Sequence, residues 1–167
     1  MQISAGKGFR LAGSTNAKGI FKFSGLNSGK FYATAILKEY EFEQSSMAVD
    51  LQDGEHAEKT LTTKRVAFSA FGSVSKMNGQ PLEHARVVAK CVGCERSEEA
   101  QVDDEGSFRI RGLIPNNKYE IHVISDSIER TVPSKISIEM KAQDSKGHQF
   151  LAFMQSQYIE ISGSVEF

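Results

Sequence analysis

The chain carries one sequence pattern twice. Residues 19–32 (GIFKFSGLNSGKFY) return 87 residues later as residues 106–119 (GSFRIRGLIPNNKY). A shorter echo follows, because residues 71–74 (FGSV) return 91 residues later as residues 162–165 (SGSV). A period of about 90 residues predicts an array of similar small domains, each with a core of its own, rather than one continuous fold.

Each copy of the pattern predicts a strand that follows a polar turn. Apolar residues alternate with polar ones at Phe21 and Phe23, and again at Phe108 and Ile110, which is typical of a strand with one buried face. We expect the shared positions to be structural, with glycines that bend the backbone and side chains that fill the two cores. These positions are Gly19, Phe21, Gly25, Leu26 and Tyr32 in the first copy and Gly106, Phe108, Gly112, Leu113 and Tyr119 in the second.

Most of the remaining sequence also predicts strands. Turn residues separate the apolar runs, and Asn78-Gly79 is a strong signal for a tight turn. No stretch has the period of a helix. The expected strands cover residues 31–37, 46–51, 57–62, 67–74, 86–90, 119–124, 135–140 and 149–154. Such spacing predicts an all-β chain of tandem antiparallel β-sandwiches with essentially no helix.

The repeat also predicts where the domains begin and end. Only 18 residues precede Gly19, and they contain no counterpart of the Gly-x-Val strand and the Asn-Gly turn at residues 72–79. We therefore expect residues 1–64 to form a truncated repeat without its opening strand and residues 65–156 to form a complete one. Residues 157–167 read as the opening strand of a third repeat, so the chain resembles a window onto a longer array.

Composition excludes several classes of function. The formal net charge is -1, and the 20 lysines and arginines are scattered, so no basic stripe predicts nucleic-acid binding. No apolar run approaches the roughly 20 residues that span a bilayer, and the first residues lack the apolar stretch of a signal peptide. The histidines stand apart at His56, His84, His122 and His148, and no G-x-S-x-G pattern occurs. We expect no enzymatic activity, no catalytic residue and no cofactor.

Cys91 and Cys94 are the two cysteines, in a single C-x-x-C pattern. One such pair supplies too few ligands for a structural zinc site, and His84 and His122 lie at no finger-like spacing. A thioredoxin-like site would need a βαβ context, which is absent from the pattern. The alternatives that remain are free thiols in a hairpin loop and a short-loop disulfide.

Asp103-Asp104-Glu105-Gly106 invites comparison with a calcium loop. The spacing of an EF-hand loop is absent, and the first copy places Asn16-Ala-Lys-Gly19 at the equivalent position. Because a metal role would not survive the loss of those carboxylates, we interpret the segment as a turn rather than a metal site.

Carbohydrate binding is the main alternative function for such a fold. Sugar platforms usually rely on exposed aromatic rings, and this chain has no tryptophan. Tyr40, Phe42 and Tyr158 are the best candidates for exposed rings. The competing interpretation is that these three rings pack between domains.

A string of motifs carries a family resemblance. Gly72-x-Val74, residues 78–87 (NGQPLEHARV), Asp104-x-Gly106-x-Phe108 and residues 112–119 (GLIPNNKY) together resemble prealbumin-like, carboxypeptidase-regulatory-like β-sandwich repeats. Residues 38–46 (KEYEFEQSS), followed by residues 67–74, narrow the resemblance to the late lumenal repeats of the nodal modulator family. The resemblance covers nearly the whole chain.

The resemblance implies a place and a set of partners. Nodal modulators are single-pass proteins of the endoplasmic reticulum membrane with tandem sandwiches in the lumen, and they are not enzymes. The family resemblance implies partnership with nicalin and a small multi-pass subunit, beside the translocon, in the biogenesis of multi-pass membrane proteins. It also implies a lumenal location, which favours the disulfide between Cys91 and Cys94, and attachment to a membrane only through an anchor in the parent chain.

Overall fold

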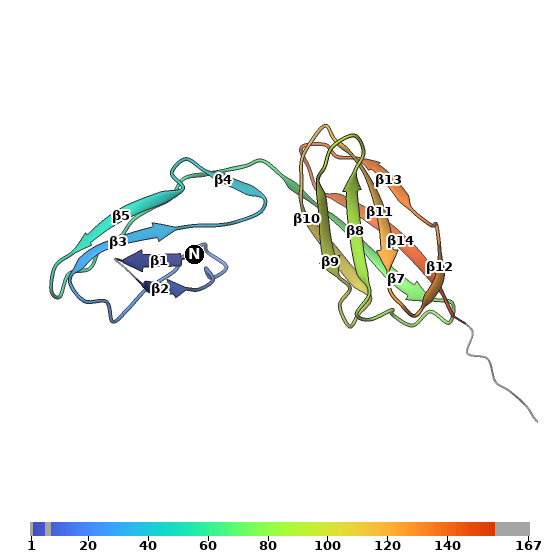
Figure 1. Ribbon diagram of the computed structural model, residues 1–167, viewed down its shortest axis with the longest axis horizontal. Helices are drawn as coiled ribbons and strands as arrows, with labels where there is room; N and C mark the ends of the chain where they lie inside the picture. The colour runs from blue at the N-terminus through green and yellow to red at the C-terminus, as the bar shows by residue number, and fades with distance from the viewer. Residues whose placement is uncertain (1, 6–7, 156–167) are drawn as a thin grey trace, which may run out of the picture. The chain divides into compact units, whose positions relative to one another are not determined.

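The computed structural model describes residues 2–5 and 8–155 and divides the chain between Val66 and Ala67 into two compact units (Figure 1). Every regular element among the described residues is a strand. The prediction of an all-β chain is therefore confirmed. The expected opening strand at residues 157–167 lies outside the described residues.

The second unit is a sandwich of two four-stranded sheets. One sheet has the order β10-β7-β14-β12 and the other the order β13-β11-β8-β9. The strands are β7 (Phe68–Lys76), β8 (Arg86–Cys91), β9 (Ser97–Gln101), β10 (Ser107–Leu113), β11 (Lys118–Ile124), β12 (Ile128–Val132), β13 (Ile136–Glu139) and β14 (Ser145–Met154).

Strand β7 is the centre of its sheet and pairs along both edges. It runs antiparallel to β10, with Phe108 opposite Gly72, and parallel to β14, with His148 opposite Gly72. The β7–β14 ladder is parallel, whereas the other ladders of this unit are antiparallel. The first and last strands of the unit therefore lie side by side and point the same way.

Alternation of side chains builds the core between the two sheets. In β10 the side chains of Phe108 and Ile110 are buried while Ser107, Arg109 and Arg111 are exposed. Phe108 packs near Phe150 of β14, with ring centroids 6.3 Å apart. The fully buried Tyr119 completes the core, and its hydroxyl accepts a hydrogen bond from the Ile114 N–H at 3.0 Å. Burying that hydroxyl costs little because it is hydrogen-bonded.

The first unit contains only one four-stranded sheet, of order β2-β1-β3-β5. The sheet has the strand order of β9-β8-β11-β13 in the second unit. A separate two-stranded ribbon joins β4 and β6. The strands are β1 (Gln2–Ala5), β2 (Phe9–Ala12), β3 (Gly29–Thr34), β4 (Tyr40–Phe42), β5 (Ser46–Leu51) and β6 (Thr63–Arg65).

The ribbon holds the segment whose sequence is most specific to the family resemblance. Glu39 precedes β4, is only 4% exposed, and forms an ion pair with Arg65 of β6 at 3.3 Å. The Glu39 carbonyl also accepts a hydrogen bond from the Val66 N–H at 2.9 Å. These contacts fix the end of the first unit at the residues that lead into β7.

Two predicted strands of the first unit are wrong. Residues 20–24 and residues 57–62 have the alternating sequence of strands, but neither segment belongs to a sheet. Their counterparts in the second unit are β10 and β14. The order of the elements along the chain supports this match. The pairing of β6 with β4 supports it as well, because it corresponds to the pairing of β14 with β12. Both β10 and β14 hydrogen-bond to β7. No described strand lies between the two segments of the first unit, so each lacks the ladder that would make it a strand.

The expectation that Tyr32 fills the core is also wrong. Tyr32 is 50% exposed, whereas its neighbour Phe31 is only 6% exposed. Lys30-Phe31 matches Lys118-Tyr119 once the preceding turn is taken as one residue shorter in the first copy. Because side chains alternate along a strand, this slip of one residue turns Tyr32 to the outer face.

The close packing at Gly72 gives a test of the central strand. A Cβ at this position would overlap the carbonyl oxygen of His148 and the ring of Phe108. We expect Gly72→Ala to destabilise the second unit by at least about 2 kcal/mol, since the backbone of β14 must move. Urea unfolding followed by NMR signals of second-unit core methyl groups measures this. Ser73→Ala, one residue along β7, is the matched control, and an equal effect of both substitutions would contradict the packing argument.

Candidate functional site

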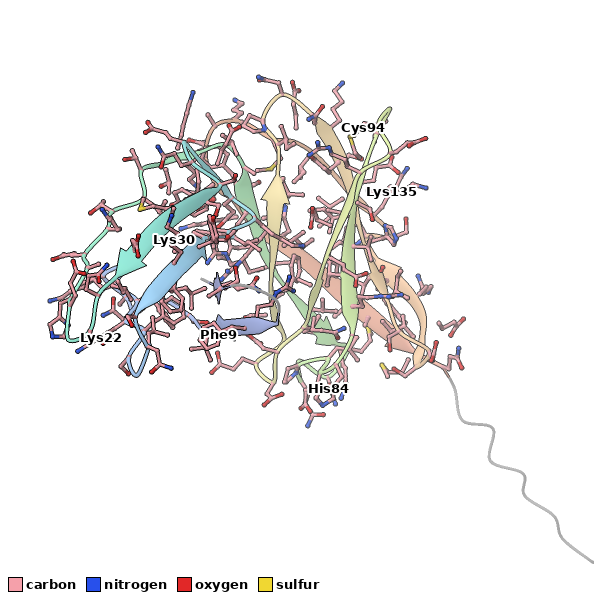
Figure 2. The ribbon with its side chains drawn as sticks, turned by 60° about the vertical axis from the view of Figure 1, so that its left-hand side comes forward. Phe9, Lys22, Lys30, His84, Cys94 and Lys135 are labelled. Atoms are coloured by element: carbon pink, nitrogen blue, oxygen red, sulfur yellow. A yellow bond between two sulfur atoms is a disulfide. The ribbon has the colours of Figure 1, made fainter. Side chains whose placement is uncertain are left out.

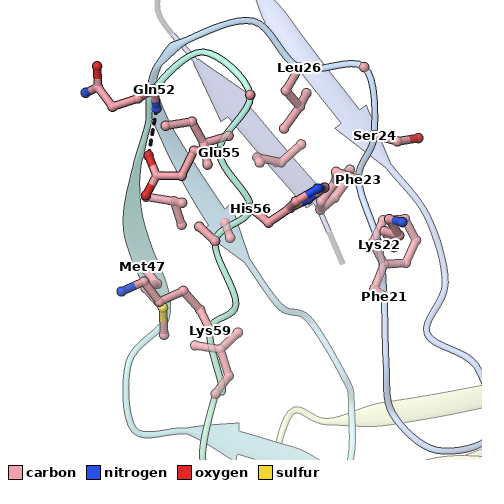
Figure 3. Close-up of a pocket in the computed structure, with 18 residues that line it drawn as sticks. Phe21, Lys22, Phe23, Ser24, Leu26, Met47, Gln52, Glu55, His56 and Lys59 are labelled. Atoms are coloured by element: carbon pink, nitrogen blue, oxygen red, sulfur yellow. Dashed lines mark hydrogen bonds between the residues drawn. The ribbon is translucent and has the colours of Figure 1, made fainter.

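One hollow among the described residues is a groove in the first unit, with a volume of about 470 Å³. Its floor is the inner face of the sheet, where Ile3, Ala33, Met47 and Val49 contribute side chains. Residues 21–26 line one side and residues 51–61 the other, as Figure 3 shows. We call this hollow the open groove.

The open groove is apolar at its base and polar at its rims. Phe21 and Phe23 pack against each other with ring centroids 4.3 Å apart and remain only half-buried. Lys22, His56 and Lys59 stand around the opening (Figure 3). At one end, the Gln52 N–H donates to Glu55 Oε2 at 2.8 Å. The groove therefore offers apolar contacts and segments of backbone outside any ladder, but no group of polar side chains suited to catalysis.

The polar turns before the two repeated segments have the same hydrogen bonds. Asn16 Oδ1 accepts from the N–H groups of Lys18 and Ile20 at 2.9 and 3.0 Å. Asp103 Oδ1 accepts from Glu105 and Ser107 at 3.1 and 2.7 Å. The shared glycines of both copies have positive φ: Gly19 (76°), Gly25 (71°), Gly106 (78°) and Gly112 (90°). Asn16 and Asp103 can fill the same position because the turn requires only a side-chain oxygen that accepts hydrogen bonds from the backbone.

The same geometry bears on the comparison with a calcium loop. Asp103 uses its Oδ1 atom to accept the two backbone N–H groups of the turn. Asp104 instead lies near Glu83 and His84, and their ligand atoms fall within 4.8 Å of one another. All three side chains are exposed, and exposed acidic groups gather in this way without a metal. The interpretation of residues 103–106 as a turn agrees with these hydrogen bonds. Apart from the proximity of the three exposed side chains, no observation supports a metal ion near Asp104.

Cys91 and Cys94 lie at the β8–β9 hairpin. Their Cα atoms are 5.4 Å apart and their Sγ atoms are at bonding distance, so the structure joins them as a disulfide. Cys91 is buried at the edge of the core, whereas Cys94 is exposed. Cys94 and His84 mark opposite ends of the second unit (Figure 2). The redox state of the pair in solution stays a prediction.

The four histidines occupy unrelated environments. His56 lines the open groove, His84 is exposed, and His122 is half-buried in β11. His148 is buried in β14, and its Nε2 atom lies 2.8 Å from Ser145 Oγ. Burial lowers the pKa of His148, because desolvation penalises the imidazolium form. The structure thus brings no two of the histidines into one site.

The candidate aromatic residues for carbohydrate binding do not form an exposed platform among the described residues. Tyr40 and Phe42 are half-buried in the β4–β6 ribbon, and Tyr158 lies outside the described residues. Phe9 and Tyr32 are more exposed, at 40% and 50%. Phe9 packs on the inner face against Phe31, whereas Tyr32 faces outward, so these two rings lie on opposite faces of the sheet.

Sequence reasoning missed the open groove. Residues 51–61 form one side of it, whereas the alternation of residues 57–62 predicts a strand there. The repeat itself contained a signal for the groove. In the second unit β7 separates β10 from β14, and the sequence before residue 20 contains no counterpart of β7. A groove between the two segments follows from that gap once the order of the sheet is known.

Comparison with known proteins gives a clear set of relatives, although no protein-family model matches. The BOS complex subunits NOMO1 of Mus musculus and NOMO3 of Homo sapiens are each 35% identical over 164 residues, which cover 94% of this chain and 13% of each relative. Nicotinic receptor-associated protein 4 of Caenorhabditis elegans is 32% identical over 142 residues, covering 82% of this chain and 13% of the relative.

Two solved structures show a low degree of similarity to the chain. The minor pilin GBS52 of Streptococcus agalactiae is 15% identical, covers 88% of this chain and 70% of its own, and has a TM-score of 0.42. The TIE protein of Bacillus anthracis is 17% identical, covers 90% of this chain and 30% of its own, and has a TM-score of 0.39.

The fold defines a class of all-β proteins with two compact units in succession, the second of which is a β-sandwich. Within that class, the chain is a homologue of the nodal modulators, the NOMO subunits of the BOS complex. It spans 13% of the length of these relatives. The described residues contain no helix that could cross a membrane.

Intact mass tests the disulfide. We expect the mass of the purified chain to rise by about 2 Da on reduction, since two hydrogen atoms are added when the bond between Cys91 and Cys94 breaks. Cys94→Ser should destabilise the second unit by about 2 kcal/mol, the loop-closure value for so short a loop. Ser97→Ala, at the start of β9, is a control in the same hairpin. An unchanged mass after reduction would contradict the disulfide.

The buried His148 predicts a dependence of stability on pH. In the unfolded chain its pKa returns to the ordinary value of about 6.5, so below that pH the unfolded state binds more protons than the folded state. The free energy of unfolding of the second unit therefore falls as the pH drops below about 6.5 toward the lowered folded pKa. Urea unfolding between about pH 7 and about pH 5 should show a smaller loss of stability in His148→Gln than in the unchanged chain. His84→Gln, with an exposed imidazole, is the matched control, and equal losses in all three chains would contradict this assignment.

Proposed function

We propose that the chain is a non-enzymatic structural and interaction segment of a nodal-modulator-like protein in the lumen of the endoplasmic reticulum. The observation that carries the proposal is the identity of 35% with the NOMO subunits across 94% of the chain, which includes both units. The relatives are named as subunits of a complex, so the role inferred for this segment is to contact or to space other proteins.

The geometry of the chain supports a binding role. The described residues include an apolar groove in the first unit and a sandwich of two four-stranded sheets in the second. A disulfide between Cys91 and Cys94 suits an oxidising compartment such as the lumen. By the family resemblance, the partners would be nicalin and the translocon, in the biogenesis of multi-pass membrane proteins, and the membrane would be reached through an anchor elsewhere in the parent chain.

A segment exchange tests the proposal. The homologous segment of human NOMO1 is replaced by residues 1–167, and co-purification with nicalin is measured after solubilisation of the membrane. We expect the chimera to retain nicalin at a level within about twofold of the unaltered protein, since a change of that size is under 0.5 kcal/mol.

An unrelated pair of β-sandwich domains of equal length serves as the control, because it keeps the spacing but not the surface. If this control also retained nicalin, the segment would be a spacer without a specific contact. Loss of nicalin from a correctly folded chimera with residues 1–167 would contradict the proposed membership of a BOS-type complex.

A further inference from the structure

One sheet of the second unit, of order β10-β7-β14-β12, has an outer face that points away from the core. In β10, Phe108 and Ile110 are buried between the two sheets, so Arg109 points outward. Phe71 of β7 lies opposite Arg109 in the ladder. Paired residues of neighbouring strands point to the same side of a sheet, so Phe71 and Arg109 share the outer face.

Strands β14 and β12 extend the same face. Alternate residues of β14 are buried in the core, so Leu151 and Phe153 point outward and are half-buried. Arg130 lies opposite Phe153, and Val132, which is 47% exposed, lies opposite Leu151. We call this surface the cationic face, and its main residues are Phe71, Arg109, Arg130, Lys146, Leu151 and Phe153.

The cations of this face lie over its aromatic rings. Arg130 Cζ is 4.0 Å from the centroid of the Phe153 ring. Arg109 Cζ and Lys146 Nζ are 5.1 and 5.9 Å from the centroid of the Phe71 ring. The Arg109 Nε–H also donates to a serine hydroxyl of β7 at 2.8 Å. A ring holds a cation in place without neutralising it, so the charge remains available to a carboxylate from another molecule.

Positive charge on the cationic face is not matched by acidic residues of the face itself. The outward positions that the ladders define contain no carboxylate. The acidic residues nearest in sequence lie at its borders, with Glu105 before β10, Glu129 at the bulge of β12 and Asp144 before β14. Asp144 accepts a hydrogen bond from a backbone N–H of β7 at 2.9 Å. Within the described ranges, neither Arg130 nor Lys146 forms an ion pair.

The outer face of the other sheet carries charges that pair with each other. Arg86 lies 3.5 Å from Glu99, and Lys135 lies 2.6 Å from Glu120. Such exposed pairs satisfy their own charges and contribute little to stability. The cationic face instead combines aromatic rings, aliphatic side chains and arginines, which is the composition that protein interfaces favour at their centres.

We propose that the cationic face docks an acidic, extended segment of a partner protein. Carboxylates of the partner pair with Arg130 at one end of the face and with Lys146 at the other, and apolar side chains between them pack on Leu151 and Val132. Charge complementarity of this kind steers the encounter and selects the partner. The inference rests on the proposed role in contacting other proteins, and it adds the surface and the chemistry of what binds there.

The register of the strands gives the spacing of the acidic residues. In the parallel ladder Ser75 lies opposite Leu151, four residues along β7 from Phe71, and Phe153 lies two residues further along β14. At about 3.3 Å per residue, the two clusters of ring and cation are roughly 20 Å apart. An extended segment covers that distance in about six residues, and residues six positions apart point to the same side.

An NMR titration of the full chain tests the docking surface. The probe is a short peptide with two glutamates about six positions apart, leucine and valine between them on the same side, and serines on the other side. We expect amide shifts concentrated at residues 130–132 and 149–153, and binding that weakens at least about threefold between about 50 and about 500 mM NaCl. The same peptide with glutamine for both glutamates should bind at least about tenfold more weakly.

Charge reversal on two faces locates the contact. Arg130→Glu combined with Lys146→Glu should weaken binding of the acidic peptide at least about tenfold, because attraction becomes repulsion at both ends. The matched control is Lys90→Glu combined with Lys118→Glu, which changes the net charge equally but alters two exposed lysines on the outer face of the other sheet. We expect the control to bind the peptide like the unchanged chain.

Several outcomes would overturn the inference. They are shifts confined to the other sheet, equal binding of the glutamine peptide, and equal losses in the two charge reversals. A dimer of the unchanged chain that protects the cationic face would assign it to a second copy, and binding to phosphatidylserine vesicles in place of the peptide would assign it to a membrane. A cationic face that ignores the peptide, in a chimera that retains nicalin, overturns this inference alone. Loss of nicalin by a chimera whose segment binds the peptide overturns the proposed function alone.

Discussion

The pairing of β7 on both of its edges is the interaction on which the sandwich depends. In the second unit this strand supplies a partner to β10 and to β14 at once, and its glycine allows Phe108 and the backbone of β14 to approach closely. The first unit shows the converse. Its residues 20–24 and 57–62 keep the sequence of strands, but without a strand between them they remain outside any sheet. Strand sequence is thus insufficient where a partner is lacking, because a strand exists only through its ladder.

Local features of the chain could be predicted from the sequence, and features that depend on distant partners could not. The turns at Asn16 and Asp103 are set by a side-chain acceptor and a glycine within a few residues, so the repeat alone identified them. Strand β5 was predicted over the range that the structure gives. Strand β9 was missed because its sequence, SEEAQ, is polar, and only Glu98 and Ala100 turn inward. The order of the sheets, and with it the open groove, arises from contacts between residues far apart in the chain.

The error at Tyr32 shows how little sequence change separates a core residue from a surface one. An ungapped alignment of the two copies matches Tyr32 with Tyr119, yet Phe31 is the side chain that is buried. One residue fewer in the turn before β3 reverses which side chains face inward. The sequence allowed either choice, because Phe31, Tyr32, Ala33 and Thr34 offer moderately apolar side chains on both faces. Only the pairing of β3 with β1 and β5 decides between them.

The parallel ladder between β7 and β14 gives the second unit a particular response to mechanical load. The chain enters this unit at the start of β7 and leaves it at the end of β14, so tension on the two ends acts along the ladder in opposite senses. All the hydrogen bonds between the two strands then resist shear together, rather than opening one after another as in a hairpin pulled from its open end. A unit built in this way resists extension along the direction in which the chain passes through it, because its first and last strands would have to slide past each other.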